Sequence, residues 1–333
     1  MGVRYLPNRL KRLAEFYEAK AYDVIINNTS PETQLLLPCL SSSVIRIAVM
    51  RVLNPSALKS LAMNSEYLHA AVGISDEMRR VMAADPRIKA PVRLIPNCTT
   101  VKGGTFPKLH HPLKICYVGR VSIPDKNVLI LPRIAVLLKK NQIDFSLDIV
   151  GDGPARPKLE RDFANLCTNN IFFHGSLPRE ETNRIMSHSN FVLLPSFSEG
   201  LSNVMLEGMS TGCVPICSDI DNFRWVLGNV APQLQCRLNN PEDYAGRIIY
   251  LSSDVDTYIE MQKYLRGRQQ EMFTPERTIR GYLDMIIELT SRNARVLPPS
   301  CTFETMPIPR AYRLYCSPLW RLAQKAKDLF TDG

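Results

Sequence analysis

Short apolar runs rich in β-branched residues alternate along most of the chain with longer amphipathic stretches. The apolar runs predict strands at 23–26, 44–50, 71–74, 92–95, 114–118, 146–150, 171–173, 191–194 and 214–217. Between them, apolar positions recur with the helical period of about 3.6 residues, at 77–84, 129–141, 155–165, 180–187, 204–210, 241–251 and 275–290. Strands that alternate with helices are typical of βαβ units around a parallel sheet, so the sequence predicts an α/β fold.

A segment rich in glycine, proline and histidine at 99–112 interrupts this pattern and predicts a linker. We therefore expect one Rossmann-like domain with a parallel sheet at 1–103, a second at 104–290, and an extension at 291–333. The first domain has four predicted strands, whereas a doubly wound nucleotide-binding sheet usually has about six. It opens instead with a helix-like segment whose apolar residues share one face: Leu6, Leu10, Leu13 and Tyr17. We expect this first domain to be incomplete.

The positive charge of the chain is concentrated at its two ends. The 333 residues carry a formal net charge of +9. Residues 1–22 hold five basic residues against two acidic ones, and residues 291–333 hold seven against three. The near-neutral middle argues against nucleic acid as a partner, because nucleic-acid binding requires a basic surface.

The basic extension contains a second amphipathic pattern. Ser317 and Pro318 predict a helix start. An apolar stripe follows beside three basic residues: Leu319, Leu322, Ala326, Leu329 and Phe330 with Arg321, Lys325 and Lys327. A basic amphipathic helix suits the surface of an anionic membrane. Packing of the same helix on the domain surface explains the pattern equally well.

The remaining composition indicates the compartment. No apolar run approaches the roughly 18 residues that span a bilayer, and the first residues lack the apolar core of a signal peptide. The nine cysteines show no Cys-x-x-Cys pair and no Cys/His ligand spacing, which is typical of reduced cysteines. We expect a cytoplasmic protein, with peripheral contact at the cytosolic membrane face.

Four polar or glycine-containing segments each directly follow a predicted strand of the second domain. They are 117–120 with the nearby Lys126, 149–154, 172–175 and 195–207. Because the carboxyl ends of parallel strands meet at one edge of a sheet, we expect these segments to lie together. In the last of them, Ser202 or Asn203 is placed to cap a helix, whose free backbone N–H groups attract anions. Glu199 precedes that helix and Glu207 lies one turn inside it, so both carboxylates are candidates for the same crevice.

This order of motifs resembles the carboxy-terminal half of family four retaining glycosyltransferases, which have the GT-B fold. The motifs are Gly-Arg…Lys, Val-Gly-Asp-Gly-Pro, Phe-x-Gly, Pro-Ser-x-x-Glu-Gly and Glu-x7-Glu. The resemblance implies that Arg120 and Lys126 bind the donor diphosphate, that Glu199 contacts the transferred sugar, and that Glu207 contacts the ribose hydroxyls. It implies catalytic roles for Arg120, Lys126 and Glu199.

The rest of the implied donor-binding set is made of loop residues. The loop Gly200, Leu201, Ser202 and Asn203 would offer N–H groups to the phosphates, and Gly175, Ser176 and Leu177 would lie beside the nucleobase. Gly119 and Gly151 complete the set.

The implied chemistry suits these residue types. When the bond to a nucleoside diphosphate breaks, negative charge grows on the leaving phosphate, and two cations with a helix N-terminus stabilise it. We therefore expect no cofactor and no metal. The Asp-x-Asp triplets at 219–221 and 254–256 are interpreted as chance matches, and His174 as a packed histidine at a strand end.

The first domain departs from the family pattern. Residues 1–22 contain no strand followed by a glycine-rich loop, and 51–55 read Arg-Val-Leu-Asn-Pro where the family often has a histidine. The segments 72–75 and 94–98 do match. Three explanations stay open: the true start lies upstream, a partner chain supplies the missing strands, or the protein binds the donor with reduced catalysis.

The predicted function is transfer of a sugar, with retention, from a UDP- or GDP-linked donor to a glycan or lipid-linked acceptor. The process would be the biosynthesis of a cell-surface polysaccharide or glycoconjugate. Two alternatives remain: a catalytically silent nucleotide-sugar-binding subunit of a two-chain enzyme, and a nucleotide-sugar epimerase with the GT-B fold.

Overall fold

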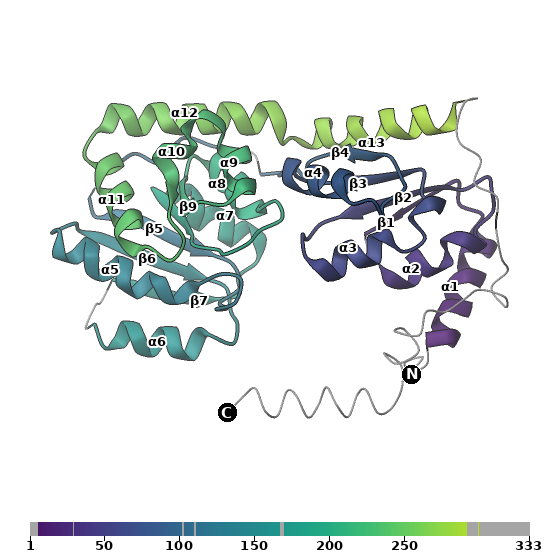
Figure 1. Ribbon diagram of the computed structural model, residues 1–333. Helices are drawn as coiled ribbons and strands as arrows, with labels where there is room; N and C mark the ends of the chain where they lie inside the picture. Colours follow the sequence, from purple (N-terminus) through teal and green to yellow (C-terminus); the bar gives the residue numbers. More distant parts are fainter. Residues whose placement is uncertain are drawn as a thin grey trace. The chain divides into compact units, whose positions relative to one another are not determined.

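A computed structural model of the chain describes residues 6–28, 30–101, 103–109, 111–166, 170–291 and 299, and within α1 no side chains before Arg9 (Figure 1). These residues form two compact units. The N-terminal unit takes the described residues up to Gly73, Met78–Leu94 and those from Leu283 onward, and the C-terminal unit takes Ile74–Glu77 and Ile95–Tyr282. The predicted helix in the basic extension lies outside the described residues.

The N-terminal unit contains a four-stranded parallel sheet in the order β1-β2-β3-β4. Its strands are β1 (Val24–Asn27), β2 (Ile45–Met50), β3 (Ala70–Gly73) and β4 (Val92–Leu94). Its other elements are α1 (Leu6–Lys20), α2 (Pro31–Leu36), η1 (Leu37–Cys39), α3 (Pro55–Ala62), η2 (Ser65–Tyr67) and α4 (Asp76–Ala84). The four predicted strands are confirmed, and β2 and β3 are buried along their whole length.

The predicted apolar face of α1 is buried against α2. Leu10 and Ala14 form a cluster with Leu35 and Leu36, and Leu13 and Tyr17 pack at its border. Burial of this apolar face holds α1 in place. Along the helix, basic residues are interspersed among the apolar ones. The side chain of Leu6, predicted on the same face, is outside the described residues.

The C-terminal unit contains a six-stranded parallel sheet in the order β10-β9-β8-β5-β6-β7. Its strands are β5 (Leu113–Val118), β6 (Phe145–Val150), β7 (Ile171–Gly175), β8 (Phe191–Leu194), β9 (Val214–Ser218) and β10 (Gln235–Cys236). The chain moves outward from β5 to β7 and then returns to the other side of β5. The order therefore reverses between β5 and β8, and in open α/β sheets ligands bind outside the carboxyl ends of the strands at such a point.

Helices cover both faces of this sheet. They are α5 (Leu131–Lys140) after η3 (Val128–Ile130), α6 (Arg156–Ala164), α7 (Arg179–His188), α8 (Asn203–Thr211), α9 (Asp221–Leu227), η4 (Gly228–Val230), α10 (Ala231–Leu234), α11 (Pro241–Ser252) and α12 (Val255–Met272). Helices α6 and α11 pack beside α5, whereas α7 and α12 pack beside α8 (Figure 1). Helix α13 (Pro275–Thr290) begins in this unit and ends in the N-terminal unit, where Glu288 pairs with Arg93 at 2.5 Å.

The sequence pattern missed the longest of these helices, α12. Two of its buried positions are glutamines rather than apolar residues, which weakens the helical period. The Gln262 amide donates to the carbonyls of Gly212 at 2.7 Å and Pro107 at 3.1 Å, so it anchors the linker to the end of α8. The described residues of 99–112 form no helix or strand, as predicted. Within the described chain, no helix has both the length and the apolar character to span a membrane.

Candidate functional site

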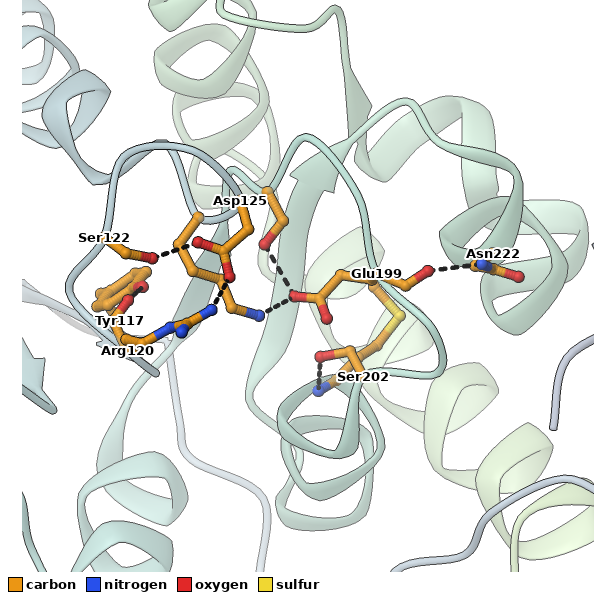
Figure 2. Close-up of polar contacts among 10 residues, drawn as sticks. Tyr117, Arg120, Ser122, Asp125, Glu199, Ser202 and Asn222 are labelled. Atoms are coloured by element: carbon orange, nitrogen blue, oxygen red, sulfur yellow. Dashed lines mark hydrogen bonds and ion pairs between the residues drawn. The ribbon is translucent and has the colours of Figure 1, made fainter. Parts of the chain in front are cut away.

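The loop after β5 holds Arg120 between two fixed groups. The buried Tyr117 hydroxyl donates to the Arg120 carbonyl oxygen at 2.7 Å. Burial raises the pKa of Tyr117, so the hydroxyl stays protonated and remains a donor. Figure 2 shows the Asp125 carboxylate between the Arg120 guanidinium and the Ser122 hydroxyl, and both groups donate to it. The backbone of Arg120 is therefore positioned by Tyr117 and its side chain by Asp125.

The pKa of Asp125 reflects these contacts. Partial burial acts to raise it, but the hydrogen bonds from Ser122 and Arg120 and the positive charge of Arg120 outweigh this effect and lower the pKa. Asp125 is therefore ionised at neutral pH and acts as the counter-ion of Arg120.

Glycines bring the loops after β5, β6 and β7 together. A Cβ atom at Gly151 would lie 1.9 Å from the Gly119 carbonyl oxygen, and one at Gly153 would lie 2.4 Å from that of Val121. The Gly151 amide donates to the Gly175 carbonyl at 2.7 Å. The predicted site residues Gly119, Gly151 and Gly175 are therefore packed against one another, and the close approach requires that Gly151 have no side chain.

An ion pair joins β5 and β8 at the point where the strand order reverses. Lys126 follows β5, Glu199 follows β8, and their charged groups are in contact although they lie 73 residues apart in the sequence (Figure 2). The Ser196 hydroxyl also donates to Glu199 Oε1, at 2.8 Å, and Asn222 Nδ2 donates to the Glu199 carbonyl at 2.7 Å. The side chains of Lys126 and Glu199 are 23% and 13% exposed, so this pair is largely shielded from solvent.

Helix α8 begins beside this pair. Ser202 is its cap, because the Ser202 hydroxyl accepts a hydrogen bond from the Met205 amide at 3.4 Å. Of the two predicted caps, Ser202 is therefore the one observed, and Asn203 is the first residue of the helix. The amides of the first turn have no acceptor within the helix, which makes this end an electropositive site.

Glu207 lies in the second turn of α8 and forms an ion pair with Arg179, the first residue of α7. Arg179 Nη2 donates to Glu207 Oε1 at 2.9 Å. Burial raises the pKa of Glu207, and the charge and hydrogen bond of Arg179 act in the opposite direction. Arg179 was not singled out from the sequence. Its position directly after the predicted base-side loop, Gly175 to Leu177, was a signal that could have identified it.

The structure thus places the predicted residues at one edge of the sheet of the C-terminal unit. It brings Lys126 and Glu199 into contact, and the Phe197 amide donates to the Asp125 carbonyl at 2.9 Å, which ties the Arg120 loop to the Glu199 loop. Sequence reasoning missed the supporting groups: Asp125, Ser196 and Asn222. Asp125 and Asn222 carry no motif of their own, and Ser196 belongs to the Pro-Ser-x-x-Glu-Gly motif but had no role assigned to it; the roles of all three follow from their contacts.

The acidic triplets and His174 have partners of their own. Asp219 and Asp221 both pair with Arg224, and Asp254 caps α12. His174 Nε2 lies 2.6 Å from Asp148 Oδ1 on the neighbouring strand, but His174 is exposed, so the prediction of a packed histidine is wrong; side chains alternate between the faces of β7, and His174 shares the outer face with the exposed Phe172. Within the described ranges, no cluster of three or more His, Cys, Asp or Glu side chains is arranged to hold a metal ion.

Residues 112–254 match the family model described as "Glycosyl transferases group 1". An uncharacterized glycosyltransferase of Methanocaldococcus jannaschii is 26% identical over 151 residues, which are 44% of this chain and 42% of that protein. The 2-deoxystreptamine glucosyltransferase of Streptomyces kanamyceticus is 32% identical over 92 residues, 27% of this chain and 24% of that protein. The chain spans less than half the length of the curated relatives that it matches.

Solved structures show the same fold. A sucrose-phosphate synthase from Thermosynechococcus elongatus superposes with a TM-score of 0.72 at 18% identity, over 86% of this chain and 79% of that one. The pneumococcal O-GlcNAc transferase GtfA, solved with UDP and GlcNAc, superposes with a TM-score of 0.69 at 14% identity, over 84% and 60%. The predicted α/β fold with two Rossmann-like parallel sheets, of the GT-B type, is confirmed.

Proposed function

We propose that this chain is a glycosyltransferase whose C-terminal unit binds a nucleoside diphosphate sugar at the edge between β5 and β8. The observation that carries the proposal is the Lys126–Glu199 ion pair at the point of strand reversal. It lies within the segment that matches the glycosyl transferase model, and Arg120 and the start of α8 lie beside it. The reaction we propose is transfer with retention to a glycan or lipid-linked acceptor, in polysaccharide or glycoconjugate biosynthesis.

The diphosphate is assigned to the cations and the helix end. Arg120 and Lys126 supply two positive charges, and the amides at the start of α8, with those of Gly200 and Leu201, supply neutral donors. Once the donor is bound these groups would be in place, and they would stabilise charge on the leaving phosphate without further reorganisation. Two cations and a helix end are sufficient for this role, and we propose a reaction that requires no metal.

Glu199 is assigned to the transferred sugar. In the structure, its carboxylate accepts hydrogen bonds from Lys126 and Ser196. A bound diphosphate would attract Lys126, and the carboxylate would then accept hydrogen bonds from sugar hydroxyls. Attack from the face of the leaving group, which the family resemblance implies for retention, requires no nucleophile from the protein.

The nucleoside is assigned to the loop after β7 and to Glu207. Gly175, Ser176 and Leu177 lead from β7 into α7, where the base would lie, and the Glu207 carboxylate would accept hydrogen bonds from the ribose. The structures of the pneumococcal transferase with UDP and GlcNAc, and of Anabaena HepE with UDP-glucose, support UDP as the first nucleotide to test, with GDP as the second.

The test is calorimetric titration of UDP and GDP into the wild-type protein and into Arg120→Ala and Lys126→Ala. A charged hydrogen bond contributes about 1.5–3 kcal/mol, so each substitution should weaken binding by at least tenfold. Lys140→Ala is the matched control, because Lys140 is an exposed lysine at the far end of α5. Unchanged affinity in both site variants would contradict the diphosphate assignment. If wild type binds a nucleotide, saturation-transfer NMR against a panel of nucleotide sugars would identify the base and the sugar.

A donor-binding subunit without catalysis is the second candidate. The observation that favours it is the four-stranded sheet of the N-terminal unit, in which the described residues pair β1 with β2 alone. The outer edge of β1 can accept further strands, and a partner chain is one source of them. Transfer by the purified chain would contradict this candidate. An epimerase would instead isomerise the donor with no acceptor present.

We also propose that the protein binds a membrane surface, where a lipid-linked acceptor would lie. Residues 291–333 carry seven basic residues against three acidic ones, and we propose that they hold the protein at an anionic cytosolic surface. Flotation with phosphatidylglycerol vesicles tests this. The full chain should float with the vesicles and a chain ending at residue 311 should not; equal flotation of the two would dismiss a membrane role for residues 312–333, which hold four of the seven basic residues.

A further inference from the structure

The ion pair between Arg179 and Glu207 joins two helices beside the proposed nucleoside site. Arg179 is the first residue of α7 and directly follows the loop that leaves β7. Glu207 lies on α8, 28 residues later in the sequence. The two side chains meet with Nη2 and Oε1 2.9 Å apart.

The two partners differ in exposure. The Glu207 side chain is 11% exposed, whereas that of Arg179 is 56% exposed. Helix α8 is held close to the sheet, since a Cβ at Gly208 would lie 3.1 Å from Val192 Cγ1. Glu207 therefore has a fixed backbone and a shielded carboxylate, and the guanidinium reaches it from the solvent side.

The contact engages one oxygen of the carboxylate. Oε1 accepts the hydrogen bond from Arg179, and in the described part of the chain no group donates to Oε2. Among the charged groups on the neighbouring α12, Arg266 donates to the Ser210 and Gly104 carbonyls instead. A carboxylate that is fixed through one oxygen presents the other in a defined direction, which suits hydroxyl donors from a ligand.

Stability alone gives a weak reason for this pair. An ion pair whose arginine is more than half exposed contributes little to stability, because solvent screens it. The first turn of α7 has a separate anchor, because the Thr182 hydroxyl donates to the Pro178 carbonyl at 3.1 Å. The pair has a more specific effect on the Glu207 carboxylate: it sets the direction in which the carboxylate points and favours its charged form.

We propose that Arg179 is the positioning residue for ribose recognition: it orients the Glu207 carboxylate, so that the preference for nucleotides with both ribose hydroxyls depends on Arg179. This inference rests on the proposed function, in which Glu207 accepts hydrogen bonds from the ribose. Arg179 acts through Glu207 and need not itself contact the nucleotide.

The test compares variants of the full chain with nucleotides that lack one hydroxyl. UDP, or GDP if that is the nucleotide bound, and its 2′-deoxy and 3′-deoxy analogues are titrated by calorimetry into wild type, Glu207→Ala, Arg179→Met and Arg179→Lys. Arg184→Met is the matched control, since Arg184 is an exposed arginine on the same helix. Circular dichroism of each variant confirms that it is folded.

The expected pattern is specific to the ribose. Arg179→Met should weaken binding of the ribonucleotide about tenfold. One of the two deoxy analogues lacks the hydroxyl that Glu207 binds, and Arg179→Met should change the affinity for that analogue by less than about twofold. Arg179→Lys, which keeps a cation, should recover most of the preference, and Arg184→Met should resemble wild type. A purely structural role would weaken all nucleotides alike.

The outcomes separate the inference from the proposed function. If Glu207→Ala abolishes the preference and Arg179→Met keeps it, the inference is wrong and the ribose role of Glu207 stands. If Glu207→Ala keeps the preference, the ribose role is wrong and the inference fails with it. If wild type binds neither nucleotide, the proposed function itself is wrong.

Discussion

Replacement of Gly151 by alanine tests how the loops of the proposed donor-binding edge are held together. A Cβ atom at this position would lie 1.9 Å from the Gly119 carbonyl oxygen and 2.9 Å from its carbon, and the residue has a φ of 129°. Both neighbouring loops are fixed by hydrogen bonds: Gly151 donates to Gly175 at 2.7 Å, and Gly119 donates to Val150 at 3.0 Å. The clash therefore cannot be relieved without a shift of the backbone.

The expected cost follows from these contacts. A non-glycine residue at such a φ costs about 1–3 kcal/mol. A shift of more than about 1 Å would also break at least one of the two hydrogen bonds, which contribute about 0.5–1.5 kcal/mol each. We expect Gly151→Ala to destabilise the C-terminal unit by about 2–4 kcal/mol. For a unit of this size, about 2–4 °C per kcal/mol gives a decrease in Tm of roughly 4–16 °C.

The assay is thermal unfolding followed by circular dichroism, together with calorimetric titration of the nucleotide. The matched control is Gly246→Ala, an exposed glycine in α11 whose added Cβ would meet nothing within 4 Å. This control should gain about 0.5–1 kcal/mol, because alanine favours a helix. Gly151→Ala should also weaken nucleotide binding, since the Gly119 loop carries Arg120. A Tm and an affinity equal to those of wild type would refute the packing argument.

Three further predictions concern the groups around the site. Tyr117→Phe should cost about 0.5–1.5 kcal/mol in chemical denaturation, because it removes a buried hydrogen bond to the Arg120 carbonyl; no loss would mean that the bond is unimportant. Ser202→Ala should cost about 1 kcal/mol through the lost helix cap, and an unchanged midpoint would contradict that role. Relative to wild type, the stabilities of Asp125→Asn and Glu207→Gln should change in opposite directions as the pH rises, measured as Tm in thermal unfolding between pH 3 and pH 8. The folded-state pKa of Asp125 is lowered, so its carboxylate stabilises above the unfolded pKa of about 3.9, and the deficit of Asp125→Asn should vanish as the pH falls through the lower folded value. The folded-state pKa of Glu207 is raised by burial, so ionisation of Glu207 costs stability as the pH rises, and Glu207→Gln should gain relative to wild type toward neutral pH; a shared sign for the two variants would show that one assignment is wrong.

The sequence by itself determined the features that depend on neighbours along the chain. Nine of the ten strands in the described residues follow from apolar runs, and β10 was missed because its two residues carry no pattern. The cap of α8 at Ser202 or Asn203, the proline starts of α11 and α13, and the irregular segment at 99–112 are likewise local, because each depends on the residue type at one position and its nearest neighbours. The order of the four motifs after their strands also indicated at which edge of the sheet they gather, the edge of the proposed site.

The tertiary structure decided which strands are adjacent and which charges meet. The pairing of β5 with β8 joins segments separated by two other strands in the sequence, and it creates the reversal at which Lys126 reaches Glu199. The pairing of Arg179 with Glu207 depends in the same way on how α7 packs beside α8. Helix α12 escaped the pattern because two of its buried positions are glutamines, and the amide of one of them, Gln262, donates to carbonyls of distant segments. Local chemistry fixes where a strand, a helix or a cap begins, whereas a contact between distant residues exists only once the sheet has set their positions, and the proposed donor site depends on contacts of this second kind.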